Sequence, residues 1–150
     1  MFEQLKESHG PAVGFKVVGV LTPEDITGIT HQIETTIAAN KRPIGVLLDL
    51  AEMHGADWAA RWKEIRFLQH HTDHIARLAI VCSDRWQELS EMVVVATSFM
   101  QAETVYCHSS DIQHAWHWVR MNPMDEPVPL RVIYPGKGLF QDYTPEYVGL

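Results

Sequence analysis

The sequence predicts an α/β domain with a mixed sheet, in which an N-terminal hairpin is followed by parallel strands and the helices that connect them. The first observation is that β-branched and apolar runs alternate with helical stripes in the order β-β-α-β-α-β-α-β-α, an order typical of right-handed crossovers. The second is that two of the runs are continuously apolar, as expected of strands buried on both faces. The third is that 150 residues with 46% hydrophobic and 21% charged side chains suit a single globular core.

The first 40 residues predict a hairpin and a capped helix. Residues 1–22 form two runs around a turn at 9–11, and the second run is rich in β-branched side chains. Thr22 can cap the helix that follows, and Pro23 fits its first position. The helix is expected to end near Asn40. Its apolar stripe recurs at helical spacing and consists of Ile26, Ile29, Ile33 and Ile37.

Three more strands, three more helices and an arm are expected after residue 40. The strands are 43–50, 75–82 and 104–107, and the helices are 57–71, 85–100 and a last one over Ile112, Ala115, Trp116 and Val119. After Asn122, prolines break the chain into extended pieces, of which only Leu130–Tyr134 is expected to be a strand. We therefore expect one domain over residues 1–122. Residues 123–150 would form an arm that packs on the same domain or on a partner subunit.

Composition excludes several classes of function. The net charge of −7 and the lack of basic blocks argue against a nucleic-acid partner. No run approaches the roughly 18 apolar residues of a membrane span, and the N-terminus lacks the pattern of a signal peptide. Two cysteines are too few for a disulfide scaffold and fit a reducing compartment. We expect a cytoplasmic protein without a cofactor, with peripheral membrane contact as an open alternative.

Four short stretches, in order, carry a resemblance to a known family. They are Gly19–Asp25, Leu47–Leu50, Ile75–Val81 and Asp84–Glu88, the last of which looks like the "D-[KR]-W-x-[EK]" opening of a helix. Over roughly residues 1–121 the chain resembles the SpoIIAA-like family, small bacterial proteins that share the STAS fold of the sporulation anti-sigma factor antagonists. The resemblance implies that fold, and a ligand-binding or membrane-associating role.

The same resemblance implies that the phospho-switch of the antagonists is missing. In the phosphorylated antagonists, a strand ending "[LV]-D-[LF]" is followed eight residues later by "D-S-S-G", whose second serine accepts phosphate. Counting eight residues from Asp49 gives Asp57-Trp58-Ala59-Ala60, with Ala59 in the place of that serine. Because a methyl group cannot accept phosphate, no switch of this kind operates there.

The polar residues that could bind a metal or catalyse a reaction do not form a complete metal-binding or catalytic motif. His70, His71 and His74 cluster near a helix end, but they lack the spacing of a zinc site, so we expect no metal. Cys82 and Cys107 should lie at the carboxyl ends of parallel strands, where buried thiols more often fill space than react. Asp49, Asp57 and Asp84 could meet at the same sheet edge as acid/base groups, although capping also explains the last two. No nucleophile–base pair is visible, so no catalytic residue is expected.

Two helices carry more apolar residues than one core-facing stripe needs. In 85–100 the stripe Leu89, Val93, Ala96 and Met100 leaves other large apolar side chains over, which predicts a ligand groove between this helix and 57–71. The alternative that the arm or a second subunit covers this surface stays open. The expected lining, with Asp49 at the polar end, is Asp49, Trp58, Trp62, Trp86, Met92, Val95 and Phe99.

From this groove we predict a non-enzymatic module that binds a small apolar or amphipathic ligand such as a lipid, with a membrane surface as one place of action. The alternative is a protein-interaction module that acts through self-association or a regulator partner. A homo-oligomer is expected in either case.

Overall fold

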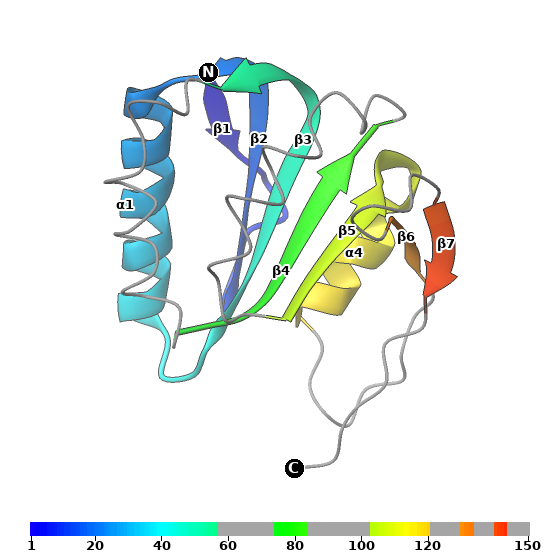
Figure 1. The fold of residues 1–150 in the computed structure, drawn as a ribbon. Helices are drawn as coiled ribbons and strands as arrows, with labels where there is room; N and C mark the ends of the chain where they lie inside the picture. The colour runs from blue at the N-terminus through cyan, green and yellow to red at the C-terminus, as the bar shows by residue number, and fades with distance from the viewer. Residues whose placement is uncertain (57–73, 84–102, 121–129, 134–139, 144–150) are drawn as a thin grey trace.

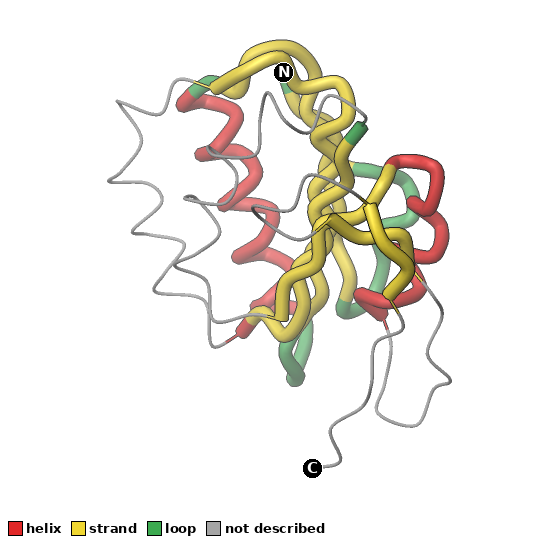
Figure 2. The backbone as a smooth tube through the Cα atoms, turned by 45° about the vertical axis from the view of Figure 1, so that its right-hand side comes forward, coloured by secondary structure: helices red, strands yellow, loops and turns green. Residues whose placement is uncertain are grey.

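The computed structural model describes residues 1–56, 74–83, 103–120, 130–133 and 140–143. In this part of the chain, a twisted sheet forms the middle layer, with one helix on each face (Figures 1 and 2). Neither of these two helices has the length and apolar character needed to span a bilayer.

The sheet has seven strands that follow one another in chain order. The outer strand β1 (Phe2–Gln4) runs antiparallel to β2 (Ala12–Leu21), which confirms the N-terminal hairpin. Strands β2 to β5 are parallel, and β6 pairs antiparallel with both β5 and β7. The remaining bounds are β3 Ile44–Ala56, β4 Ile75–Cys82, β5 Glu103–His108, β6 Leu130–Ile133 and β7 Phe140–Tyr143.

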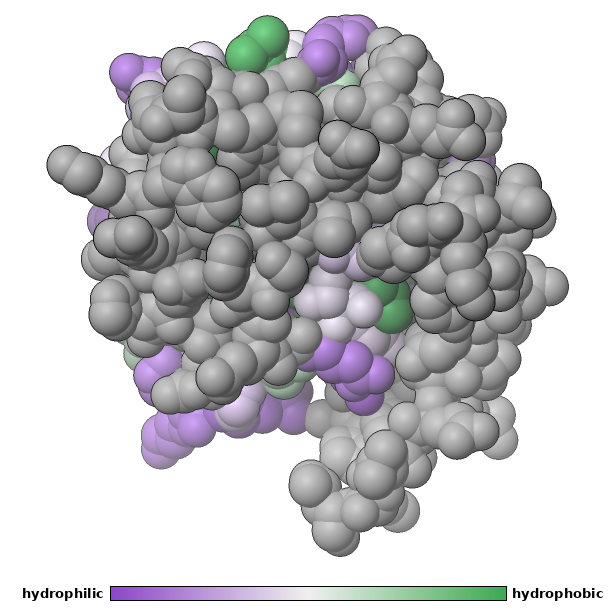
Figure 3. All heavy atoms as spheres, viewed as in Figure 1, coloured by the Kyte–Doolittle hydropathy of each residue, from purple (hydrophilic) through white to green (hydrophobic). Residues whose placement is uncertain are grey.

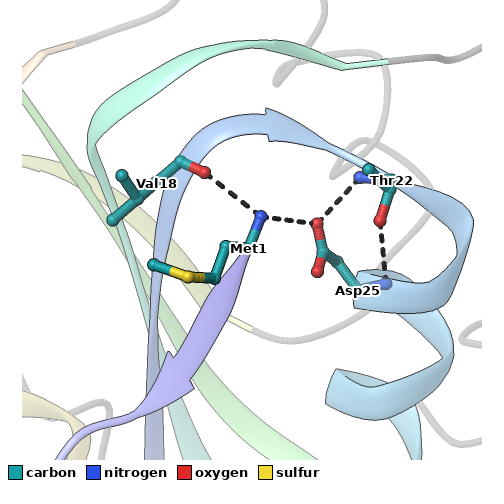
Figure 4. A network of polar contacts seen from close by, with 4 residues as sticks. All are labelled: Met1, Val18, Thr22 and Asp25. Atoms are coloured by element: carbon teal, nitrogen blue, oxygen red, sulfur yellow. Dashed lines mark hydrogen bonds and ion pairs between the residues drawn. The ribbon is translucent and has the colours of Figure 1, made fainter.

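Helix α1 (Pro23–Ala39) begins and ends as predicted, with Thr22 and Asn40 as its caps. Figure 4 shows the network at its start. Thr22 Oγ1 accepts from the Asp25 backbone N–H at 3.2 Å, and Asp25 Oδ2 accepts from the Thr22 backbone N–H at 3.0 Å. The ammonium group of Met1 donates to the same carboxylate oxygen at 2.9 Å. The first turn of α1 is thus capped, and an ion pair joins it to Met1, which directly precedes β1.

The core on the α1 face is built from alternate residues of the strands and the isoleucine stripe of the helix. Its fully or nearly buried members include Val13, Phe15, Val46, Leu78 and Ile80 from the sheet, and Ile26, Ile29 and Ile33 from α1. Phe2 packs edge-on against Phe15, with ring centroids 6.1 Å apart. The stripe therefore buries the face that its spacing predicts.

Helix α4 (Ile112–Arg120) covers the opposite face and follows a 3₁₀ turn, η2 (Ser109–Asp111). Its core is a second cluster that includes Ala12, Leu47, Ala79, Val81, Val105, Cys107, Ala115, Trp116, Trp118 and Val119. Gly45 lies directly under the backbone of Val119, where a Cβ atom would overlap it. The missing side chain therefore lets α4 sit close to β3.

Two strand predictions were wrong. The strand expected to end at residue 50 continues to Ala56, because β2 runs to Leu21 and offers partners along its whole length. Ala51–Gly55 has weak strand propensity, which is why the extension was missed. In the arm, Phe140–Tyr143 forms β7, a second strand beyond the one expected near Leu130. Its pairing with β6 is a tertiary contact that local propensity does not reveal.

Candidate functional site

A β-bulge gathers charged side chains in the middle of β2 and β3. Lys16 pairs with Asp49 and Val18 pairs with Glu52. The two pairs are therefore two residues apart on β2 but three residues apart on β3. Residues three apart on a regular strand face opposite sides, and the extra bulge residue returns Glu52 to the side of Asp49. Glu52 there forms an ion pair with Lys16.

The Asp49 carboxylate is the buried member of this group. Leu47 belongs to the core on the α4 face, so Asp49, two residues further along, faces α4 as well. Asp49 is 8% exposed, and its Oδ1 accepts from the Ala51 backbone N–H at 3.1 Å. That N–H belongs to the bulge, where the regular ladder is interrupted. Asp49 is therefore first of all a structural partner of the bulge.

Burial raises the pKa of Asp49, and the neighbouring Glu52 adds to the rise. The hydrogen bond from Ala51 and the charge of Lys16 act in the other direction without reversing it. On Lys16, the hydrogen bond with Glu52 raises the ammonium pKa against the effect of burial. The group is therefore a charge-paired cluster in which Asp49 holds its proton more strongly than an exposed aspartate does.

The two cysteines lie at the carboxyl ends of β4 and β5, as predicted. Cys82 belongs to the core on the α1 face and Cys107 to the core on the α4 face, and both are free thiols. Burial, with smaller contributions from nearby acidic groups, raises the pKa of Cys107 to about 12 and raises that of Cys82 as well. Because the thiolate is the nucleophilic form, neither thiol is activated at neutral pH.

His108 acts as a helix cap rather than as a base aimed at a cleft. Its Nδ1 accepts from the Ser110 backbone N–H at 3.1 Å and lies 2.8 Å from Ser110 Oγ. Among the described residues, no three His, Cys, Asp and Glu side chains gather as a metal site. His70 and His71 lie outside the described residues, so the expectation that the histidine cluster holds no metal stays a prediction.

Of the residues predicted to line the ligand site, Asp49 is the one that lies in the described part of the chain. We expected this residue at a strand end, but it lies well inside β3 and seven residues before Ala56. The other lining residues lie outside the described residues and remain predictions: Trp58, Trp62, Trp86, Met92, Val95 and Phe99. The same holds for Asp57 and Asp84, so their meeting with Asp49 is untested. The sequence analysis did not single out Lys16 and Glu52 as members of this polar group. The bulge brings them together, and no local sequence pattern predicts the bulge.

Most of the chain that forms this fold matches the model of a known family. The model of the SpoIIAA-like family matches residues 12–120, which is most of the chain. The chain belongs to the SpoIIAA-like family. This confirms the resemblance that the four stretches predicted.

A solved structure agrees with this family assignment. It is an uncharacterized protein of the DUF3478 family from Shewanella loihica PV-4, which has a SpoIIAA-like fold. The two chains are 27% identical with a TM-score of 0.58, and the match covers 79% of this chain and 93% of the other. A search of curated proteins found no match. The family model and this structure therefore agree on a SpoIIAA-like fold.

Proposed function

We propose that this SpoIIAA-like protein is a non-catalytic module that binds a small apolar or amphipathic ligand on the α1 face of its sheet. The observation that carries the proposal is an apolar floor, defined as Leu78, Ile80, Cys82 and Tyr106 of β4 and β5. These side chains face the α1 side, while α1 itself packs mainly over β2 and β3. The floor therefore lies beside α1 rather than under it.

The strand order supports a groove above this floor. Strands β2, β3, β4 and β5 lie side by side in chain order. A right-handed connection between parallel strands ordered in this way passes on the face that α1 occupies. In this proposal, residues 57–71 and 85–100 flank the ligand, and Trp58, Trp62, Trp86, Met92, Val95 and Phe99 contact it. Asp49 faces α4 and has no part in the groove.

The chemistry of the proposed lining selects the class of ligand. Indole rings offer a large apolar surface and a single N–H donor, and an aliphatic floor suits an acyl chain better than a charged metabolite. A lipid is the ligand of this kind that a cell supplies most widely, and it would bring the protein to a membrane surface. The raised thiol pKa values favour binding over cysteine-based catalysis.

The test is titration with an environment-sensitive fluorescent fatty acid, followed on the wild-type protein and on Trp62→Ala. The proposal predicts saturable binding to the wild type and its loss in the variant, with little change in thermal stability. Trp116→Ala is the matched control, because Trp116 is 2% exposed in the core and its removal should cost about 3–5 kcal/mol. If Trp62→Ala lowers the melting temperature as much as Trp116→Ala and the wild type binds no probe, the proposal is wrong.

A further inference from the structure

Strand β5 places a column of hydrogen-bonding side chains along the apolar floor. Val105 and Cys107 belong to the core on the α4 face, whereas Tyr106 packs on the core of the α1 face. Since side chains alternate along a strand, Thr104 and His108 share the α1 face with Tyr106. These three residues are called the polar column below. At about 3.3 Å per residue, it extends for about 13 Å along the strand.

The polar column is more open to solvent than the neighbouring strand. Each of its members has a β4 residue of the floor as its cross-strand partner: Leu78 with Thr104, Ile80 with Tyr106, and Cys82 with His108. The three β4 residues are at most 3% exposed, whereas the three members of the column are half-buried. In Figure 3, pale and hydrophobic surface of described residues shows in the middle of the view, where Figure 1 places β4 and β5. A ligand on the floor would therefore have polar groups along one side.

The polar column can donate hydrogen bonds along its whole length. His108 Nδ1 accepts from the Ser110 backbone N–H at 3.1 Å, so the neutral ring carries its proton on Nε2. The hydroxyl groups of Thr104 and Tyr106 can donate as well. All three side chains also take part in contacts within the protein, so a ligand group there would join or replace an existing contact. The column therefore favours a ligand group that accepts hydrogen bonds.

The parallel strands present no carboxylate that would repel an anionic ligand on this face. Asp49 and Glu52 lie on the α4 side of the sheet, and Glu103 shares that side with Val105. The α1 side of the described strands β2 to β5 therefore carries no Asp or Glu side chain. A hydrogen bond to an ionised acceptor is stronger than one to a neutral acceptor. An anionic head group is thus favoured over a neutral one beside the polar column.

We propose that the groove binds a single acyl chain with an acidic head group, which lies at His108 while the chain follows the floor toward Leu78. This inference rests on the proposed function and adds the class and the orientation of the ligand. His108 and Cys82 are the last residues of β5 and β4, and open α/β sheets commonly bind ligands at the carboxyl ends of parallel strands. Leu78 and Ile80 lie further from that end, where an acyl chain needs no polar partner.

The test is displacement of the fluorescent fatty acid by unlabelled ligands that share one dodecyl chain. They are dodecanoic acid, dodecyl phosphate and the neutral methyl dodecanoate. The wild type should bind at least one of the two acidic ligands about tenfold more tightly than the methyl ester. The tighter of the two identifies the head group as a carboxylate or a phosphate.

His108 variants test where the head group lies. His108→Asp keeps an oxygen that can cap the following turn, but it places a negative charge at the proposed head-group site. It should abolish the preference for the acidic ligand and leave the affinity for methyl dodecanoate nearly unchanged. His108→Ser also keeps a capping group, removes the ring nitrogens and should lower the preference about tenfold. His114→Asp, an exposed position on α4, is the matched control and should keep the wild-type preference.

Circular dichroism spectra establish that each variant is folded, and His108→Ser keeps the test decisive if His108→Asp unfolds. Equal binding of the acidic ligands and the methyl ester by the wild type overturns this inference and leaves the proposed groove in place. An unchanged preference in the His108 variants, or its loss in His114→Asp as well, does the same. If no ligand binds, the fluorescent fatty acid included, the proposed function is wrong and this inference with it.

Discussion

Helices α1 and α4 pack on opposite faces of the same sheet, and different kinds of contact hold them there. Helix α1 is fixed at its start by the Asp25 network and along its length by the packing of isoleucine side chains. Helix α4 is held by close approach, since the Val119 backbone lies on Gly45 and the Trp116 ring lies on Gly14. Side-chain contacts can adjust to a small change, whereas a backbone contact cannot.

Arginine side chains reinforce the α4 side. The Arg120 guanidinium lies 4.7 Å from the centre of the Trp116 ring and donates to the Glu7 carbonyl. The Arg77 guanidinium lies 5.2 Å from the centre of the Trp118 ring and donates to the Trp118 carbonyl at 2.9 Å. These contacts tie α4 to the β1–β2 connection and to β4. The comparison predicts that the α4 face is the rigid side of the domain and that the α1 face is the adaptable one, as a ligand site on that face requires.

A glycine replacement on each face gives the largest expected difference. Gly45→Ala places a methyl group against the Val119 backbone, and we expect a loss of about 3 kcal/mol in the free energy of unfolding. In Gly28→Ala, the new methyl group meets the far end of the Phe2 ring, which can rotate away. The gain in helix propensity, about 1 kcal/mol, should offset most of that crowding. Urea unfolding of both variants measures the contrast, and equal losses would show that the two faces do not differ in rigidity.

Removal of the carboxylate at the start of α1 should have the next largest effect. Asp25→Ala leaves the Thr22 N–H and the Met1 ammonium group without this acceptor, so we expect a loss of about 2 kcal/mol. Glu24→Ala, one residue earlier in the same turn, is the control and should cost about 0.5 kcal/mol through the helix dipole. Thermal melts in the same buffer compare the two. If both variants lose similar stability, the hydrogen bonds of the Asp25 network contribute nothing beyond the effect of a negative charge at the start of the helix.

The two buried aspartates should give pH dependences of opposite sign. Burial alone would raise the pKa of Asp25, but the hydrogen bonds from Thr22 and the Met1 ammonium outweigh burial and lower it. Its stabilising contribution is therefore present above the ordinary aspartate pKa of about 3.9 and is lost as pH falls through the folded-state value. Burial raises the pKa of Asp49, so its contribution is present at low pH and is lost as pH rises through the folded-state value.

Stability curves of Asp25→Asn and Asp49→Asn, each compared with the wild type between about pH 3 and pH 7, test these signs. The deficit of Asp25→Asn should shrink as pH falls. The stability of Asp49→Asn relative to the wild type should improve as pH rises. Parallel difference curves would contradict the assignment of opposite shifts.

The same two regions show what sequence reasoning can reach. The cap of α1 is encoded by four adjacent residues, Thr22 to Asp25, whose roles follow from local chemistry, and it was predicted. The bulge that brings Glu52 beside Lys16 depends on the register of β3 against a strand some 30 residues away, and no local pattern contains that register. Strands β3 and β4 were predictable as buried parallel strands because each contains a continuous apolar run. The aromatic lining of the groove stays a prediction, since it lies outside the described residues.

Native mass spectrometry of the freshly purified protein tests the central claim, ligand binding on the α1 face, most directly. We expect a species heavier than the 17.1 kDa chain, or than a whole multiple of it, by the mass of a small hydrophobic molecule. That added mass should disappear on denaturation, and the Trp62→Ala variant should not carry it. A bare chain mass in every charge state, together with no uptake of an added fatty acid, would contradict the claim.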